Sequence, residues 1–207
     1  MTNSPTSRDV IFDKLRRATA SIAEKEAAPE YDDAILHCKP CLKGDDPVEI
    51  FTRNFTAANG IVMRSIKELS DFLHEKDLSY GYCDGLAFND FGRPLFETGF
   101  SISTLFERDQ TDRYDFAMTP ATAAIAESGT VVLDDDHTSD RLAALAPWIH
   151  IAILETSSIL RTIPEGLAAL GDSSNAIWIT GPSKTADVEG ILIEGVHGPG
   201  IQIALLA

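Results

Sequence analysis

The sequence predicts an α/β domain with a largely parallel sheet, and three observations lead to this fold class. Short apolar runs typical of buried strands alternate with helix-like segments between residues 47 and 170. Hydrophobic residues make up 44% of the 207 residues, which is enough for a sizeable core. No internal repeat or low-complexity tract interrupts the alternation. A chain of this length suits one domain with a small extension.

The N-terminal segment is predicted to be a helix followed by a linker. Apolar residues recur at helical spacing at Val10, Ile11, Leu15, Ala18 and Ile22. This spacing favours a helix over residues 10–25, with Thr6 or Ser7 as its N-cap. Residues 27–46 contain proline, aspartate and cysteine without a sustained period, which is typical of a linker or long loop. We therefore expect residues 1–46 to form a helix and linker, and residues 47–207 to form the main domain.

The main domain is expected to continue the alternation of helices and strands. Helices are predicted at residues 48–60, 66–76, 121–126, 141–146 and 158–170. Strands are predicted at residues 61–63, 79–83, 115–118, 130–133, 149–154, 176–179, 191–193 and 201–205. Such strands imply a sheet that is covered on both faces. The last strands have few residues between them, so they could form an antiparallel edge.

Charge and hydropathy exclude several classes of partner. The formal net charge is -15, which disfavours binding to nucleic acid or to an anionic membrane because no Lys/Arg cluster offsets it. An anionic ligand would have to be bound locally, by main-chain N–H groups and one or two cations. No apolar stretch reaches the ~18–20 residues that span a bilayer. The first residues lack the apolar core of a secretory signal, so a cytoplasmic location is expected.

The cysteines and the histidine–acid runs give no strong metal signal. Three cysteines cannot supply the four thiolates that an iron–sulfur cluster usually needs. Cys38 and Cys41 form a lone C-x-x-C whose role is structural, incidental or, as the open alternative, redox. The acidic run from Asp134 to His137 is typical of a solvated turn rather than a cation site. We expect no metal site and no cofactor, and we expect His150 to be a hydrogen-bonded core histidine.

Two glycine-containing loops near the C-terminus have the composition of a binding site. In the first, Gly181 allows close approach of the main chain, Ser183 and Thr185 offer hydroxyls, and Lys184 adds a positive charge. Asp187 could orient Lys184. The second loop places His197 next to Gly198, where an imidazole could act as a general acid–base. The alternative is that both loops only satisfy their own main-chain groups.

A third turn, Ala126 to Thr130, presents a carboxylate beside a glycine. Glu127 could contact a ligand at the end of the sheet, with main-chain donors from Ser128, Gly129 and Thr130. The alternative is a capped turn in which Glu127 accepts main-chain hydrogen bonds. Farther along, Arg141 could bind a substrate carboxylate in bidentate fashion, or it could be a surface residue of a helix.

The same segments resemble a known family. Gly-Pro-Ser-Lys-Thr-Ala-Asp at 181–187 and Gly-Val-His-Gly-Pro at 195–199 resemble the signature of the lactate-utilisation (LUD) domain family, in its small single-domain C branch. Residues 119–130, and Arg141 with Pro147 and His150, also fit. The resemblance implies a Rossmann-like three-layer fold of the NagB/RpiA/CoA-transferase-like group. Separately, residues 126–130 resemble the glutamate–glycine turn of CoA transferases, in which the equivalent carboxylate attacks an acyl-CoA, although Ala126 and Ser128 depart from the usual flanking residues.

What the resemblance implies about function leaves three alternatives. The first is a subunit that supports oxidation of L-lactate to pyruvate beside iron–sulfur partner proteins, as a non-redox accessory or ligand-binding component. The second is a CoA-transferase-like enzyme, or one acting on a phosphorylated metabolite, that uses Glu127. The third is a docking subunit without catalysis. For a site we expect Glu127 and His197 as catalytic residues and a small anionic ligand in one shared pocket. The expected ligand-binding residues are Ser128, Gly129, Thr130, Arg141, Gly181, Ser183, Lys184, Thr185, Asp187 and Gly198.

Overall fold

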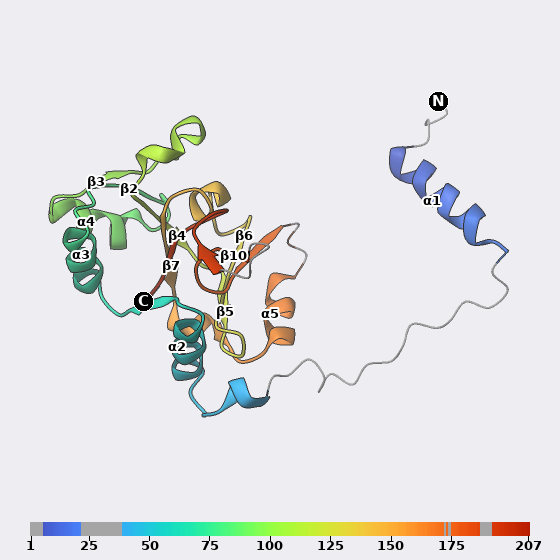
Figure 1. Cartoon of the computed structure of the whole chain (residues 1–207), viewed down its shortest axis with the longest axis horizontal. Coiled ribbons are helices and arrows are strands. Elements are labelled where there is room, and N and C mark those ends of the chain that lie inside the picture. The colour runs from blue at the N-terminus through green and yellow to red at the C-terminus, as the bar shows by residue number, and fades with distance from the viewer. Residues whose placement is uncertain (1–5, 22–38, 172, 174, 187–191) are drawn as a thin grey trace. The chain divides into compact units, whose positions relative to one another are not determined.

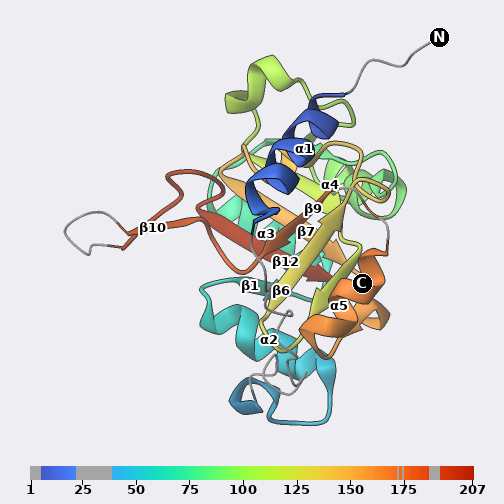
Figure 2. The ribbon, with the colours of Figure 1, turned by 90° about the vertical axis from the view of Figure 1, so that its right-hand side faces the viewer.

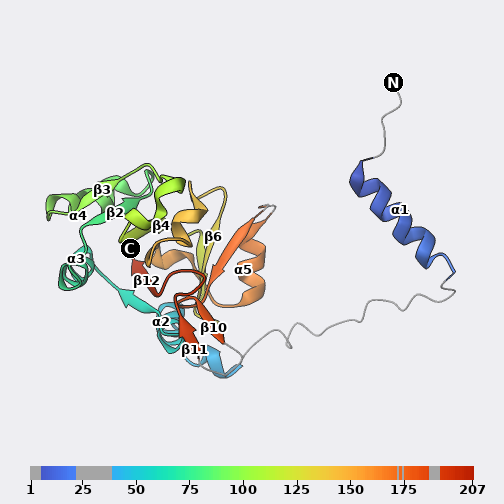
Figure 3. The ribbon, with the colours of Figure 1, turned by 45° about the horizontal axis from the view of Figure 1, so that its top comes forward.

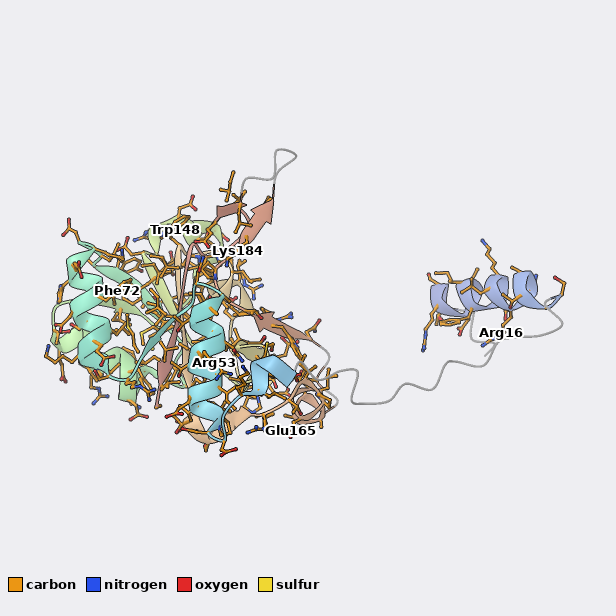
Figure 4. All side chains as sticks on the ribbon, turned by 60° about the horizontal axis from the view of Figure 1, so that its bottom comes forward. Arg16, Arg53, Phe72, Trp148, Glu165 and Lys184 are labelled. Carbon is orange, nitrogen blue, oxygen red and sulfur yellow. The ribbon has the colours of Figure 1, made fainter. Side chains whose placement is uncertain are left out.

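The computed structural model describes residues 6–21, 39–171, 173, 175–186 and 192–207. The chain divides into two compact units, Met1–Asp33 and Ala34–Ala207. In the first unit, helix α1 spans Ser7–Thr19 and begins at Thr6, whose side chain forms a reciprocal capping box with Asp9. None of the residues of α1 is buried. Figure 4 shows the side chains of this helix, with Arg16 labelled. The expected helix is therefore confirmed from its cap to Thr19, and residues 22–25 lie outside the described residues.

The second unit is built on a six-stranded sheet in which all neighbouring strands are parallel. Its order is β1 (Ile61–Met63), β12 (Ile201–Leu206), β7 (Ile149–Leu154), β4 (Phe116–Pro120), β2 (Tyr80–Cys83) and β3 (Ser101–Ser103). The prediction of an antiparallel C-terminal edge is wrong for β12, which lies between β1 and β7. Residues 202–206 of this strand are all buried, because the strand is paired along both edges and covered on both faces.

Helices cover one face of this sheet. Helix α3 (Ile66–Glu75) begins at Ser65, whose hydroxyl accepts a hydrogen bond from Glu68 N. It is joined there by the π-helix Phe88–Gly92 and by α4 (Arg93–Glu97). Leu69, Leu73 and Leu95 pack against the isoleucines of β7 and β12 in a continuous core. Figure 1 shows α3 and α4 together on one side of the central strands.

A second, four-stranded sheet covers the other face, together with α2 (Pro47–Ala57). Its order is β8 (Ile159–Leu160), β5 (Ala123–Ile125), β6 (Thr130–Asp134) and β9 (Ala176–Ile179), with β5–β6 and β6–β9 antiparallel. Helix α5 (Ile163–Leu170) packs on the outer side of this sheet, against Ala123, Ile125 and Val132 (Figure 1). The predicted α/β class with a mostly parallel sheet is confirmed, but a sheet takes the place of helices over much of this face.

One predicted helix is wrong, and two others are shorter than expected. Residues 123–125, expected to be helical, form β5, because pairing with Thr130–Val132 across a short turn overrides the helix preference of alanine. The helix expected at 158–170 begins only at Ile163, with Thr162 as its N-cap and Pro164 in its first turn. Proline suits the first turn of a helix, because the N–H that it lacks would have no partner within the helix there. The helix expected at 141–146 is a shorter 3-10 helix, η5 (Arg141–Ala144).

The segment before α2 packs with the second unit. It contains a 3-10 helix, Lys39–Leu42. Arg53 donates to the carbonyls of Cys41 and Lys43, and Arg161 donates to those of Leu42 and Gly44. The two compact units divide between Asp33 and Ala34, and the division of the chain into residues 1–46 and 47–207 stays a prediction.

A small hairpin completes the described fold. Strands β10 (Lys184–Ala186) and β11 (Leu192–Glu194) pair antiparallel and project from the body of the unit in Figure 2. They lie beside the end of α2, as Figure 3 shows. Among the described residues, no helix combines the length and hydrophobicity that crossing a bilayer requires.

Candidate functional site

Two turns that are separated in the sequence by the β10–β11 hairpin lie side by side at the amino end of β12. They line one cavity of about 260 Å³. Ser183 N donates to Pro199 O at 2.9 Å, and Gly195 N donates to Ser183 O at 2.8 Å. We call this space the turn cavity. Its walls are formed by residues 180–183, 197–199, Ala144, Leu145, Ile177, Trp178, Ile179 and Gln202. Two of the three segments expected to converge, 181–187 and 197–199, therefore contribute to the same cavity, the first of them through residues 181–183.

The first turn is held against the end of α2. Gly181 has φ +76°, and a Cβ atom added there would collide with the Ala58 carbonyl oxygen, so the position requires glycine. Lys184 Nζ donates to the same Ala58 oxygen at 2.8 Å and lies 3.7 Å from Glu194 Oε1. Lys184 thus anchors the hairpin to α2 and does not line the turn cavity. Thr185 pairs with Ile193 within the hairpin, and Asp187 lies outside the described residues.

The second turn supplies His197, which is the one ionisable side chain among the described residues that line the turn cavity. His197 is exposed at the cavity, and a Cβ added to Gly198 would lie 3.2 Å from Ser183 Cβ, which shows how closely the two turns pack. The walls therefore combine hydroxyls, an imidazole, a carboxamide and main-chain groups with an apolar side formed by Leu145 and Ile177. This composition suits a small polar molecule rather than a polyanion.

The turn that carries Glu127 lies in the second sheet, between β5 and β6. Glu127 is 1% exposed, and its Oε2 accepts a hydrogen bond from Ile163 N at 3.1 Å, at the start of α5. Its main chain is bound as well, because Glu127 N donates to Arg161 O and Asn54 Nδ2 donates to Glu127 O. Glu127 therefore caps α5 and does not line the turn cavity.

Gly129 explains why this turn is fixed. It has φ +62°, and an added Cβ would lie 2.5 Å from the carbonyl carbon of Asn54 and closer still to Phe55 N. Ser128 Oγ lies 2.6 Å from Thr130 Oγ1, which in turn lies 2.6 Å from Thr180 Oγ1. Thr180 lines the turn cavity, so this hydroxyl chain is the connection between the Glu127 turn and the cavity.

Arg141 lines a second cavity of about 580 Å³, together with Arg108, Thr138 and Ser139. The two cavities share Leu145 and Ile177, so they are neighbours. Arg141 Nε contacts Asp135 Oδ1 at 2.6 Å, and Arg108 Nε contacts Asp140 Oδ2 at 2.9 Å. Because each guanidinium already faces a carboxylate, the charge available to an anionic ligand here is largely neutralised.

The sequence analysis did not single out Gln202, which forms part of the turn cavity. Its carboxamide contacts the imidazole of His150, and His150 contacts Thr119 Oγ1 at 2.9 Å. His150 is fully buried, and burial lowers its pKa to about 4. The prediction of a hydrogen-bonded core histidine is confirmed. The signal for Gln202 was available, since it is the one polar residue of an otherwise apolar strand.

Within the described ranges, no group of three or more His, Cys, Asp or Glu side chains is arranged to hold a metal ion. In the Asp134–His137 run, His137 Nδ1 lies 2.8 Å from Asp134 Oδ1 in a turn. Burial raises the pKa of the Cys83 thiol to about 12, so this cysteine is not reactive at neutral pH. Cys38, one half of the C-x-x-C, lies outside the described residues.

Comparisons with known proteins match the resemblance stated above. The LUD domain model matches residues 95–206. Lactate utilization protein C from Macrococcus caseolyticus is 30% identical over 177 residues, which is 76% of each chain. The protein of the same name from Deinococcus radiodurans is 37% identical over 97 residues, 44% of this chain and 45% of that protein. That from Shouchella clausii is 33% identical over 129 residues, 56% of each. The chain thus spans about half the length of the latter two relatives.

One solved structure is similar as well. It is a crystal structure of a DUF162 family protein from Deinococcus radiodurans, with a TM-score of 0.47 and 18% identity. The alignment covers 79% of this chain and 100% of that one.

Proposed function

We propose, from the premise that this chain belongs to the LUD domain family, that it is a subunit of an L-lactate utilisation system and binds a small organic acid in the turn cavity. The name of its relatives, Lactate utilization protein C, supports the metabolic role. The observation that carries the binding role is the cavity itself, which the 181–183 and 197–199 turns form together. At about 260 Å³ it is smaller than cavities for drug-sized ligands, which suits a small metabolite.

The chemistry of the walls supports an acid with a single negative charge. Polar groups come from Ser183, Thr180, Gln202 and His197, while Leu145 and Ile177 provide an apolar side for a methyl group. None of the described residues that line the turn cavity is a lysine or arginine, so a polyphosphate would lack countercharge from them. Because the chain carries a net charge of -15, an anion must be held by such local hydrogen bonds rather than by the overall field.

Electron transfer in this proposal belongs to iron–sulfur partner proteins. The 207 residues include three cysteines, fewer than the four thiolates that a cluster usually needs, and no G-x-G-x-x-G fingerprint for a dinucleotide. Exposed apolar side chains near the turn cavity support docking to a partner. Trp148 is 55% exposed and lies close to Gly195 and Gly200; Leu145 and Val196 are also exposed. Apolar side chains gathered at a surface are typical of protein interfaces. Figure 4 labels Trp148.

Binding is tested by titrating the purified full chain with L-lactate, pyruvate, phosphate and coenzyme A. Calorimetry gives the affinity, and the thermal shift gives the change in melting temperature. We expect L-lactate or pyruvate to bind and phosphate and coenzyme A not to. His197→Ala should weaken binding about tenfold, since a hydrogen bond to a charged group contributes about 1.5 kcal/mol. The control is His137→Ala, an exposed histidine that does not line the turn cavity. Equal effects of the two substitutions would contradict the assignment of the cavity.

Docking is tested separately, by co-purification of the full chain with the iron–sulfur proteins of its own organism. We expect a complex that Trp148→Ala weakens, with Phe96→Ala, an exposed aromatic residue of α4 that does not line the turn cavity, as the control. A complex that forms equally well with either variant would remove Trp148 from the interface. The absence of any complex would overturn the subunit role.

A CoA-transferase-like activity remains the alternative proposal, with Glu127 as the nucleophile. The position of Glu127 does not favour it, because the carboxylate is buried and accepts the Ile163 N–H. A Glu127→Gln variant that folds and keeps full transferase activity would overturn this alternative. Transfer of coenzyme A from acetyl-coenzyme A to a carboxylic acid, abolished by Glu127→Gln, would support it.

A further inference from the structure

A row of three polar side chains crosses the apolar layer between the two sheets. Thr119, His150 and Gln202 come from the neighbouring strands β4, β7 and β12, and they are 0%, 0% and 1% exposed. Gln202 is directly opposite His150 in the strand register, and Thr119 is two residues beyond the partner of His150 on β4. The surrounding layer is apolar, with alanine and leucine on the same strands. Burying polar groups in such a layer costs free energy unless their hydrogen bonds are made.

The contacts within this row engage both ring nitrogens of His150. Its Nε2 lies 2.9 Å from Thr119 Oγ1. Its Nδ1 lies 3.1 Å from Gln202 Oε1 and 2.8 Å from Gln202 Nε2. A neutral imidazole carries one donor and one acceptor nitrogen, so Nδ1 can satisfy only one end of the carboxamide. The other end of Gln202 then has no hydrogen-bond partner among the described residues.

The side chain of Gln202 is placed where a ligand could complete its hydrogen bonds. Gln202 is one of the residues lining the turn cavity, whereas His150 and Thr119 are not among them. A nearly buried polar group without a partner is rare in folded proteins and needs an explanation. A ligand in the cavity would supply the missing partner: a carboxylate or carbonyl oxygen for the amide N–H groups, or a hydroxyl for the amide oxygen.

We propose that Gln202 is the residue that hydrogen-bonds the ligand of the turn cavity, and that Thr119 and His150 are positioning residues that hold its carboxamide in place. This inference rests on the proposed binding function and names its ligand class: a small hydroxy or oxo acid, whose carboxylate and neighbouring oxygen both match a carboxamide. Propionate lacks the second oxygen and should bind more weakly than L-lactate.

The direct test is nuclear magnetic resonance of the ¹⁵N-labelled full chain, titrated with L-lactate and with pyruvate. The side-chain NH₂ signals of Gln202 are assigned by their loss in Gln202→Met. We expect them to shift along the same binding curve as the main-chain signals of His197 and Gly198. If those main-chain signals shift and the Gln202 side chain does not, this inference is wrong and the binding function stands. If no signal shifts with either acid, both are wrong.

A double-mutant cycle tests the positioning role. Gln202→Met should weaken binding of L-lactate about tenfold, while the control Gln110→Met, at an exposed glutamine, should leave it unchanged. Thr119→Val should weaken binding about threefold in the natural chain, although Thr119 does not line the cavity, and should have no further effect in Gln202→Met. Additive effects on binding would mean that Thr119 does not act through Gln202, and the positioning role would be overturned.

Discussion

The turn at Glu127–Thr130 and the turn that begins at Gly181 have similar compositions but different surroundings. Each has a glycine at positive φ, a hydroxyl side chain and a nearby ionisable group. In the first turn the glycine packs on α2 and the carboxylate caps α5, so its polar groups are engaged within the fold. The second turn also packs on α2 through Gly181, but its Ser183 side lines a cavity. The difference teaches that the elements packed around a turn, rather than its composition, decide whether its polar groups can reach a ligand.

The largest effect on stability is expected for the substitution Gly129→Ala. The substitution forces positive φ on alanine and places Cβ against the main chain of Asn54 and Phe55, which belongs to a helix and cannot move aside easily. We expect a loss of at least about 4 kcal/mol in the free energy of unfolding, measured by urea denaturation. Gly85→Ala is the control, because nothing lies within 4 Å of its added Cβ and its φ is not positive. A small effect of Gly129→Ala would mean that the first turn is not rigidly packed.

The next largest effect is a pH dependence of the free energy of unfolding, which we expect from His150 in the buried row of Thr119, His150 and Gln202. The pKa of His150 is about 4 in the folded chain, because burial disfavours the charged form, and about 6.5 in the unfolded chain. The unfolded chain therefore binds the proton first, and His150 costs stability as pH falls from about 6.5 to about 4, by about 3 kcal/mol in total.

The measurement is the urea midpoint at pH 7 and at pH 4.5, for the natural chain and for His150→Gln. Carboxylates also titrate in this range, but they are the same in both chains, so the difference isolates His150. We expect the natural chain to lose more stability on acidification than the variant. An identical pH dependence would show that His150 does not titrate from a buried, neutral state.

A smaller effect is expected for Glu127→Ala. Removing the carboxylate leaves Ile163 N without its acceptor at the start of α5, which should cost about 2 kcal/mol of stability. Glu127→Gln retains an acceptor oxygen and should cost roughly half as much. Calorimetry should give unchanged affinity for L-lactate in both variants, because Glu127 does not line the turn cavity. If a folded Glu127→Gln variant no longer bound L-lactate, the turn at Glu127 would also contribute to binding, and the two turns would not differ as described.

The smallest effect on stability is expected for Ser183→Ala. The Ser183 side chain is half-buried at the cavity, so its loss should change the free energy of unfolding by less than about 0.5 kcal/mol. Affinity for L-lactate should fall a few-fold if the hydroxyl donates to the ligand. Ser173→Ala, in the loop before β9, is the control for affinity. A loss of stability as large as that of Glu127→Ala, without a loss of affinity, would assign Ser183 to the fold instead of the site.

The local sequence determined much of the strand and helix content. The all-apolar run at 149–154 predicted a buried parallel strand, and the Thr6 cap predicted the start of α1. His150 was also predicted correctly, because a histidine within an isoleucine strand must be hydrogen-bonded in the core. These predictions succeeded because burial on both faces and helix capping each produce a pattern that can be recognised within a few consecutive residues.

The tertiary structure alone decided which of the singled-out side chains meet. The alanine run at 121–126 favours a helix locally, yet it became β5 because Thr130–Val132 pairs with it. Glu127 was turned toward α5 by that same hairpin, and Lys184 toward the end of α2. Gln202 reached the turn cavity because β12 inserts between β1 and β7. Composition records which groups can form a site, but strand order and packing fix the distances between them, and those depend on residues far apart in the chain.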